Sequence, residues 1–265
     1  MSIAFPAAPG DAKAMRARIT AVTSGKGGVG KTFMAANVAA ALARRGERVL
    51  VLDADLGLAN LDVVLNLYPK ITLHDVFTGK AELNDAILAA PGGFSVLLAG
   101  SGLVEYSRLT PEVRDQLLDV IQKVAPRFDR ILLDTGAGIS DVVLYAVSLA
   151  DDALVVATPE PTALTDAYAT IKVLANQQQR SIIKLVVNQV TRLGEGRAIR
   201  AQLQQVVDRF VISSTGTPLK LDLLGEVPLD SSVREAVQRR QLLLESFPGS
   251  AAAKGVAALA ERLMA

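Results

Sequence analysis

The chain has 265 residues, of which 28 are lysine or arginine, 27 are aspartate or glutamate, one is histidine and none is cysteine. The lack of cysteine excludes a disulfide scaffold and a thiolate metal site. The net charge of +1 argues against a tight, charge-driven grip on DNA, although it leaves room for a local basic patch. Half of the residues are apolar, which is enough to bury a large core.

The apolar stretches are interrupted by glycine, proline and arginine before they reach the ~18 residues that a transmembrane helix needs. Residues 1–9 lack the basic start of a secretory signal. We therefore expect a cytoplasmic protein. Residues 1–17 contain Pro6, Pro9 and Gly10 and are predicted to form a flexible arm, whereas 18–265 are predicted to form one domain.

Short runs rich in valine, isoleucine and leucine alternate along the chain with amphipathic helical stretches. The predicted strands are 19–23, 49–53, 94–98, 131–134, 153–157, 182–188 and 221–227. The predicted helices are 31–45, 111–124, 141–149, 162–176, 198–209, 232–239 and 250–263. Apolar strands separated by helices indicate a single-domain α/β fold, with a mostly parallel sheet that helices cover on both faces.

A glycine-rich loop follows the first predicted strand and opens the first predicted helix. Its residues Gly25, Lys26, Gly27, Gly28, Val29, Gly30, Lys31 and Thr32 satisfy the P-loop pattern G-x-x-x-x-G-K-[ST]. The glycines allow backbone N–H groups to turn towards phosphate oxygens, and the helix N-terminus adds its positive end. We expect Lys31 to face the β- and γ-phosphates and the Thr32 hydroxyl to bind Mg²⁺.

A dinucleotide site is the alternative, because the three glycines of the loop also fit G-x-G-x-x-G and Asp53 ends the second predicted strand at a suitable spacing. Three features favour a nucleoside triphosphate. Lys31 and Thr32 follow the last glycine directly, Asp55 adds a carboxylate near Asp53, and a further strand ends in Asp134, as a Walker B strand does. The triphosphate site is therefore the preferred interpretation.

The lysine at position 26 is an addition to the ordinary P-loop pattern, and it is the first feature that resembles a known family. The loop at 25–32 resembles that of the deviant Walker A ATPases of the MinD/ParA class. The segments 53–62, 134–140 and 225–230 resemble switch I, switch II and the adenine loop of the same class. Within it, the runs 53–62, 134–141 and 158–168 most resemble the flagellar-number regulators of the FlhG/FleN branch. Together these segments cover most of residues 18–245.

The resemblance implies a slow, Mg²⁺-dependent ATPase that dimerises with ATP and separates after hydrolysis to ADP. It implies that Lys26 crosses the dimer interface to the partner's phosphates and that Asp55 orients the attacking water, so that the catalytic residues are Asp55, Lys26 and Lys31. Asp53 and Asp134 would hold Mg²⁺ through water together with Thr32, because Mg²⁺ keeps several of its waters.

The resemblance also places further residues at the nucleotide. Phe33 directly follows the loop, and Asn188, Pro228 and Asp230 would surround the adenine, with the amide reading its edge. From the residues alone, a turn or capping role stays open for Asp53, Asp55 and Asn188, because such residues commonly follow strands.

Two departures from the family bear on the movement of switch II and on partners. Gly136 stands in switch II where the family commonly has alanine or proline. The arm segment 10–16 keeps only part of the motif with which FlhG proteins stimulate a partner GTPase. The expected partners are a second copy of the chain, an FlhF-type flagellar GTPase, a flagellar transcription regulator and the switch or C-ring proteins.

Other functions of the class remain as alternatives: a ParA-like partition ATPase that binds non-specific DNA, and a MinD-like ATPase that positions cell division. Arginines form two clusters that such DNA binding would use, at 192, 197 and 200 and at 234, 239 and 240, although solvated helix faces and no specific nucleic-acid partner are the expectation. Val256, Leu259, Ala260 and Leu263 form a modest apolar stripe. It would serve either peripheral membrane contact, at the cell pole or the inner membrane face, or packing on the domain itself.

Overall fold

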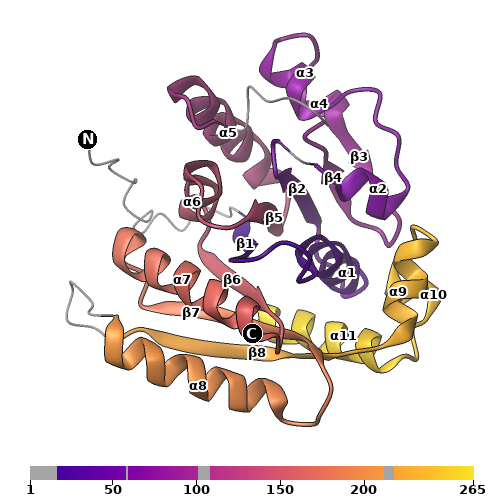
Figure 1. Ribbon diagram of the computed structural model, residues 1–265. Helices are drawn as coiled ribbons and strands as arrows, with labels where there is room; N and C mark the ends of the chain where they lie inside the picture. The colour runs from indigo at the N-terminus through magenta and orange to yellow at the C-terminus, as the bar shows by residue number, and fades with distance from the viewer. Residues whose placement is uncertain (1–16, 58, 101–107, 212–217) are drawn as a thin grey trace.

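Parallel pairing dominates the sheet of the computed structural model, which describes residues 17–57, 59–100, 108–211 and 218–265. Within these residues the sheet has 8 strands in the order β3-β4-β2-β5-β1-β6-β7-β8 (Figure 1). Only β3 and β4 pair antiparallel. The strands are β1 (Arg18–Ser24), β2 (Val49–Ala54), β3 (Ile87–Ala89), β4 (Ser95–Leu97), β5 (Arg130–Ala137), β6 (Asp152–Ala157), β7 (Ile182–Val190) and β8 (Lys220–Pro228).

Helices connect the strands and end the chain. They are α1 (Lys31–Ala43), α2 (Leu61–Leu65), α3 (Leu73–Phe77), α4 (Leu83–Ala86), α5 (Pro111–Val124), α6 (Asp141–Ser148), α7 (Pro161–Gln178), α8 (Glu195–Phe210), α9 (Ser231–Gln238), α10 (Leu243–Ser246) and α11 (Ala251–Met264). Thr110, Ser140 and Ser250 begin α5, α6 and α11 by accepting a hydrogen bond from a backbone N–H of the first turn. The predicted α/β fold is confirmed.

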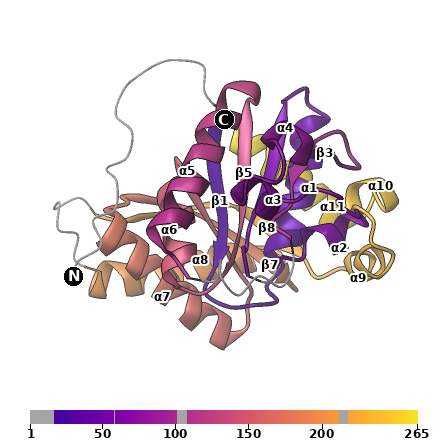
Figure 2. The same ribbon diagram turned by 90° about the horizontal axis from the view of Figure 1, so that it is seen from above.

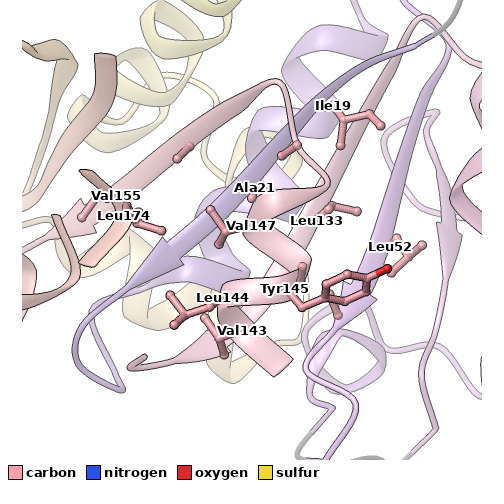
Figure 3. Packing of buried hydrophobic residues seen from close by; sticks show 14 of the residues in the cluster. Ile19, Ala21, Leu52, Leu133, Val143, Leu144, Tyr145, Val147, Val155 and Leu174 are labelled. Carbon is pink, nitrogen blue, oxygen red and sulfur yellow. The ribbon is translucent and has the colours of Figure 1, made fainter. Parts of the chain in front are cut away.

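Alternate residues of the central strands point to opposite faces, and each face packs against its own helices. In β5, Ile131 and Leu133 contribute to the core under α5, α6, α7 and α8, whereas Leu132 contributes to the core under α1 and α11. Figure 2 shows α5 and α6 on one side of β1 and β5 and α1 and α11 on the other. Figure 3 shows Tyr145 and Val147 of α6 against the strands on the first side. The sheet is therefore covered on both faces, as predicted.

Several short elements were not predicted. Strand β3 has three residues, and α2, α3, α4 and α10 have four or five each. A segment this short shows less than two turns of a helix or two alternations of a strand, so its sequence carries no measurable period. His74, the single histidine, lies within α3 beside the capping pair of Thr72 and Asp75.

The C-terminal helix α11 packs on the domain itself. Val256, Leu259, Ala260 and Leu263 are each no more than 1% exposed, and they lie in the core shared with α1 and β8. In this structure the stripe therefore packs on the domain itself, the second of the two alternatives, and membrane contact stays a prediction. In the described parts of the chain, no helix is both long and apolar enough to cross a bilayer.

The strand order brings the functional loops to one edge of the sheet. Because β1, β2, β5, β6, β7 and β8 run parallel, their carboxyl ends lie at the same edge, where ligands bind in open α/β sheets. The predicted P-loop follows β1, switch I follows β2, switch II includes the end of β5, and 158–160 follows β6. Position 58 of switch I, and the predicted arm at 1–16, lie outside the described residues, and Ala17 donates its N–H to Ala125 O at 3.0 Å.

Candidate functional site

The loop after β1 is shaped by close backbone approaches. A Cβ atom at Gly25 would lie 2.1 Å from the carbonyl oxygen of Asp166 in α7, so only glycine fits there. Gly30 precedes α1 with φ of 99°, a conformation that glycine adopts without strain. The loop borders a cavity of about 630 Å³ that is also lined by Lys31, Thr32, Phe33 and switch residues. The predicted P-loop therefore has the glycine positions and the adjoining space that a phosphate chain requires.

Lys31 begins α1 and is 9% exposed at the base of this cavity. Its Nζ donates a hydrogen bond to Ser24 Oγ at 3.0 Å. Burial lowers the pKa of Lys31, and the nearby carboxylates of Asp134 and Asp55 oppose that shift. The charged ammonium is thus partly desolvated, a state in which it interacts strongly with an incoming anion.

Asp53 and Asp134 lie opposite each other on the paired strands β2 and β5 and are 1% and 3% exposed. Among the described residues, Asp53 Oδ2 and Asp134 Oδ1 are buried without a hydrogen-bond partner. Burial raises the pKa of Asp134 to about 7, against hydrogen bonding by Thr32 and the charge of Lys31. Burial and the charge of Asp134 also raise the pKa of Asp53. Two such carboxylates are stabilised in their charged form by a cation.

These residues fit the magnesium ion that the sequence predicts. The unpartnered carboxylate oxygens and the neighbouring Thr32 hydroxyl are hard oxygen donors, which Mg²⁺ prefers. Within the described residues, no three histidine, cysteine, aspartate or glutamate side chains cluster closely enough to hold a metal alone. A cation here would therefore take its remaining ligands from the nucleotide and from water, as Mg²⁺ commonly does.

Asp55 lines the same cavity two residues beyond Asp53, and its backbone N–H donates to Asp53 Oδ1 at 3.2 Å. Its carboxylate lies close to the backbone of switch II. A Cβ atom at Gly136 would lie 3.3 Å from Asp55 Cγ and 3.3 Å from Val143 Cγ2. The family that the sequence resembles commonly has a larger residue at position 136. Glycine at this position leaves room for the Asp55 carboxylate beside the backbone.

Lys26 points away from the lining of the cavity. Its Nζ donates to Glu160 Oε1 at 2.7 Å and to Thr162 Oγ1 at 2.8 Å, at the beginning of α7. The side chains of Lys26 and Glu160 are 35% and 56% exposed, so the pair lies at the surface. The Lys26 ammonium and the Thr162 hydroxyl lower the pKa of Glu160. Within one chain, this lysine is therefore held outside the nucleotide cavity.

The predicted adenine residues are only partly brought together. Asn188 is 6% exposed, and its Nδ2 donates to Val29 O in the loop at 2.8 Å. Pro228 packs near Gly255 of α11. Asp230 begins α9 by accepting hydrogen bonds from Ser232, and its other oxygen accepts from the Ala252 N–H at 3.2 Å. None of these three residues lines the 630 Å³ cavity, so their contact with the base stays a prediction.

Three arginines of the two predicted clusters contact other residues of the chain. Arg200 donates to Leu221 O at 3.0 Å, and Arg239 pairs with Glu235 on the same helix. Arg240 lies 3.4 Å from the hydroxyl of Tyr68. The expectation of solvated helix faces without a nucleic-acid partner stays a prediction.

The sequence analysis gave no individual role to three residues that contact the loop, namely Ser24, Glu160 and Thr162. Ser24 directly precedes the P-loop pattern and lies outside its signature. Glu160 and Thr162 belong to 158–168, which was noted as a family likeness but without a role for either residue. Nothing in the sequence places α7 beside the loop, because that neighbourhood depends on β6 pairing with β1.

Comparison with known proteins decides the family. The profile of the ParA family, described as "NUBPL iron-transfer P-loop NTPase", matches residues 16–264. The chain belongs to the ParA family. As a P-loop NTPase of this MinD/ParA family, it hydrolyses ATP. Cysteine thiolates hold iron–sulfur clusters in proteins, and the sequence of this chain contains no cysteine. The iron transfer named in the family description therefore has no thiolate ligands here.

Named relatives of this ParA-family protein include bacterial flagellar proteins. It is 42% identical over 246 residues to the antiactivator FleN of Pseudomonas aeruginosa, covering 93% of this chain and 86% of FleN. It is 35% identical to the flagellum site-determining protein YlxH of Helicobacter pylori, covering 87% and 76% of the two chains. The septum site-determining protein MinD of Pyrococcus horikoshii, solved with Mg-ADP, matches with a TM-score of 0.76 and 30% identity over 93% and 96% of the chains.

Proposed function

We propose that this protein is an ATP-dependent dimerising switch with slow ATP hydrolysis that regulates the number or placement of flagella. The flagellar assignment is supported by the similarity to FleN and YlxH. The switch is supported by the position of Lys26, whose ammonium is held at the surface beside the cavity rather than within it. Such a lysine is available to a second copy of the chain.

The chain's own residues would bind and orient the triphosphate. The backbone of 25–30 and the N-terminus of α1 would surround the phosphates, and the desolvated ammonium of Lys31 would neutralise the β- and γ-oxygens. Thr32, Asp53 and Asp134 would hold Mg²⁺. When bound, that ion would neutralise negative charge on the phosphates. The attacking group is then a water molecule and not a side chain, so hydrolysis depends on how that water is placed.

Asp55 is the carboxylate placed to orient that water. It lines the cavity from switch I, while the backbone of switch II borders the same space. A carboxylate at this position can accept a hydrogen bond from water and hold it for attack. The chain has one histidine, and this residue lies in α3, so a histidine base is not part of the site.

Dimerisation would transfer Lys26 from an internal contact to an intermolecular one. The pair with Glu160 is exposed, and exposed ion pairs contribute only about 0–1 kcal/mol. Triphosphate oxygens on a partner chain carry more negative charge than one carboxylate and lie in a less solvated cleft. ATP would therefore favour the dimer, and loss of the γ-phosphate would return Lys26 to Glu160.

Replacing Lys26 should separate nucleotide binding from dimerisation. Lys26→Ala is expected to bind nucleotide with an affinity within a few-fold of wild type, because Lys26 does not line its own cavity. It should fail to dimerise with a non-hydrolysable ATP analogue, since the cation across the interface is lost. Light scattering or sedimentation of the protein with and without the analogue measures this.

Two matched variants complete that experiment. Lys123→Ala removes an exposed lysine from α5, whose partner Asp119 lies on the same helix, and should dimerise normally. Glu160→Gln removes the negative charge beside Lys26 but keeps the Lys26 ammonium, so it should also dimerise. An intact ATP-dependent dimer in Lys26→Ala would contradict the proposed role in trans.

The cellular role is tested by deleting the gene and counting flagella. We expect cells with an altered number or position of flagella, restored by the wild-type gene. The partners proposed to read the ATP-bound state are an FlhF-type GTPase, a flagellar transcription regulator or the C-ring proteins. Normal flagella together with misplaced septa or lost DNA would contradict the flagellar role and favour the MinD-like or ParA-like alternative.

A further inference from the structure

Ser24 joins the P-loop to its surroundings through its side chain. It is the last residue of β1 and is completely buried. Its hydroxyl accepts a hydrogen bond from Lys31 Nζ at 3.0 Å and donates one to Lys26 O at 2.7 Å. A hydroxyl has one donor hydrogen and can accept two hydrogen bonds, so this pairing satisfies the donor. One buried atom thus contacts both lysines of the loop, one by its ammonium and one by its carbonyl.

The backbone of Ser24 contacts switch II. Its carbonyl oxygen accepts a hydrogen bond from the Gly138 N–H of switch II at 2.8 Å. The pairing of β1 with β5 shifts register between Val22 and Ser24, so the regular ladder ends where this contact is made. Gly138 has φ of 89°, which suits glycine. Switch II is therefore attached to the residue that also holds the loop.

We propose that Ser24 is a positioning residue that fixes Lys31, the backbone of Lys26 and switch II relative to one another. This inference rests on the proposed ATPase switch and names a residue that the P-loop pattern does not contain. The three hydrogen bonds of Ser24 have different partners, so a change at any one partner is transmitted to the others through a single buried residue.

The chemistry of the ammonium supports this arrangement. Lys31 has three N–H donors, and Ser24 takes one of them. The other donors remain for phosphate oxygens, and the bond to Ser24 restricts the rotamers from which the ammonium approaches them. We infer that this bond is kept when nucleotide binds, so that it orients the ammonium for the reaction and contributes little to affinity.

Removing the hydroxyl should therefore lower turnover more than affinity. In Ser24→Ala, we expect the affinity for ADP to change by about threefold or less. ATP turnover at saturating ATP should fall at least about tenfold, because a small misplacement of catalytic groups is costly. Fluorescent-nucleotide binding and phosphate release from the full-length protein give the two quantities, and a melting curve verifies folding.

Two further substitutions distinguish positioning from packing. Ser24→Thr keeps the hydroxyl and should retain turnover within a few-fold of wild type. Ser24→Cys adds no atom but offers only a weak donor, so it should behave like Ser24→Ala. Thr20→Val is the matched control, since Thr20 is buried in the same strand and its hydroxyl has no partner among the described residues. It should leave turnover unchanged.

The outcomes separate this inference from the proposed function. Wild-type protein without ATP turnover or an ATP-dependent dimer would overturn the proposed function itself. Active wild type with equally active Ser24→Ala and Ser24→Cys would overturn only the role of Ser24. A folded Ser24→Thr with the same loss as Ser24→Ala would also overturn it, because the hydroxyl would then not be the group that matters.

Discussion

Lys31→Ala is expected to abolish nucleotide binding or to weaken it at least about 100-fold, because it removes the charge-assisted hydrogen bonds to the β- and γ-phosphates. The effect is large since this ammonium is 9% exposed and partly desolvated at the base of the cavity. Its loss also removes a positive charge that lowers the pKa of Asp134. Calorimetric titration with ADP and with an ATP analogue measures the affinity.

A second variant shows whether charge or packing is responsible. Lys31→Met keeps most of the side-chain volume without the charge and should lose binding equally. Both variants should melt as cooperatively as wild type, because the loop is anchored by its backbone and by Asn188. In cells they should produce the same flagellar phenotype as deletion. Affinity like that of wild type in either variant would contradict the proposed role of Lys31 in binding the phosphates.

The fold was predictable where the sequence has long, regular periods. Seven of the eight strands, all except β3, have sequences that show an apolar run. The helices α1, α5, α6, α7, α8, α9 and α11 are long enough to show helical spacing. Strand β3 and the short helices were missed for lack of such a period. The burial of α11 was also not decided by its sequence, because an apolar stripe has the same spacing whether it faces a membrane or a neighbouring strand.

The candidate site likewise contains residues that the sequence could locate and contacts that it could not. Residues within a contiguous pattern, such as Lys31 and Thr32, could be located because the chemistry and the spacing are both local. The contact of Lys26 with Glu160 joins residues 134 positions apart, and it depends on the strand order that places β6 beside β1. The hydrogen bond that Asp230 accepts from the Ala252 N–H depends likewise on how α11 packs against β8. Such contacts follow from topology, which a single sequence does not specify.

Asp55 provides the test that separates catalysis from binding. Asp55→Ala should bind ATP with an affinity within a few-fold of wild type, since Lys31 and the backbone of the loop supply the phosphate contacts. Its turnover should fall by about 10²–10⁴-fold, the usual cost of losing one group that positions or accepts a proton. Because hydrolysis ends the dimer in the proposed cycle, the variant should form the ATP dimer and remain in it.

The decisive measurement is phosphate release and dimer lifetime in the same preparation. Asp55→Asn keeps the size of the side chain near the Gly136 backbone and removes only the charge, so it should match Asp55→Ala. In cells, both variants should hold the partner-engaging state and give the opposite flagellar phenotype to Lys31→Ala. Normal turnover would show that Asp55 is a loop carboxylate without a catalytic role. Lost turnover without a dimer would instead mean that Asp55 shapes switch I, because the failure would then precede the reaction with water.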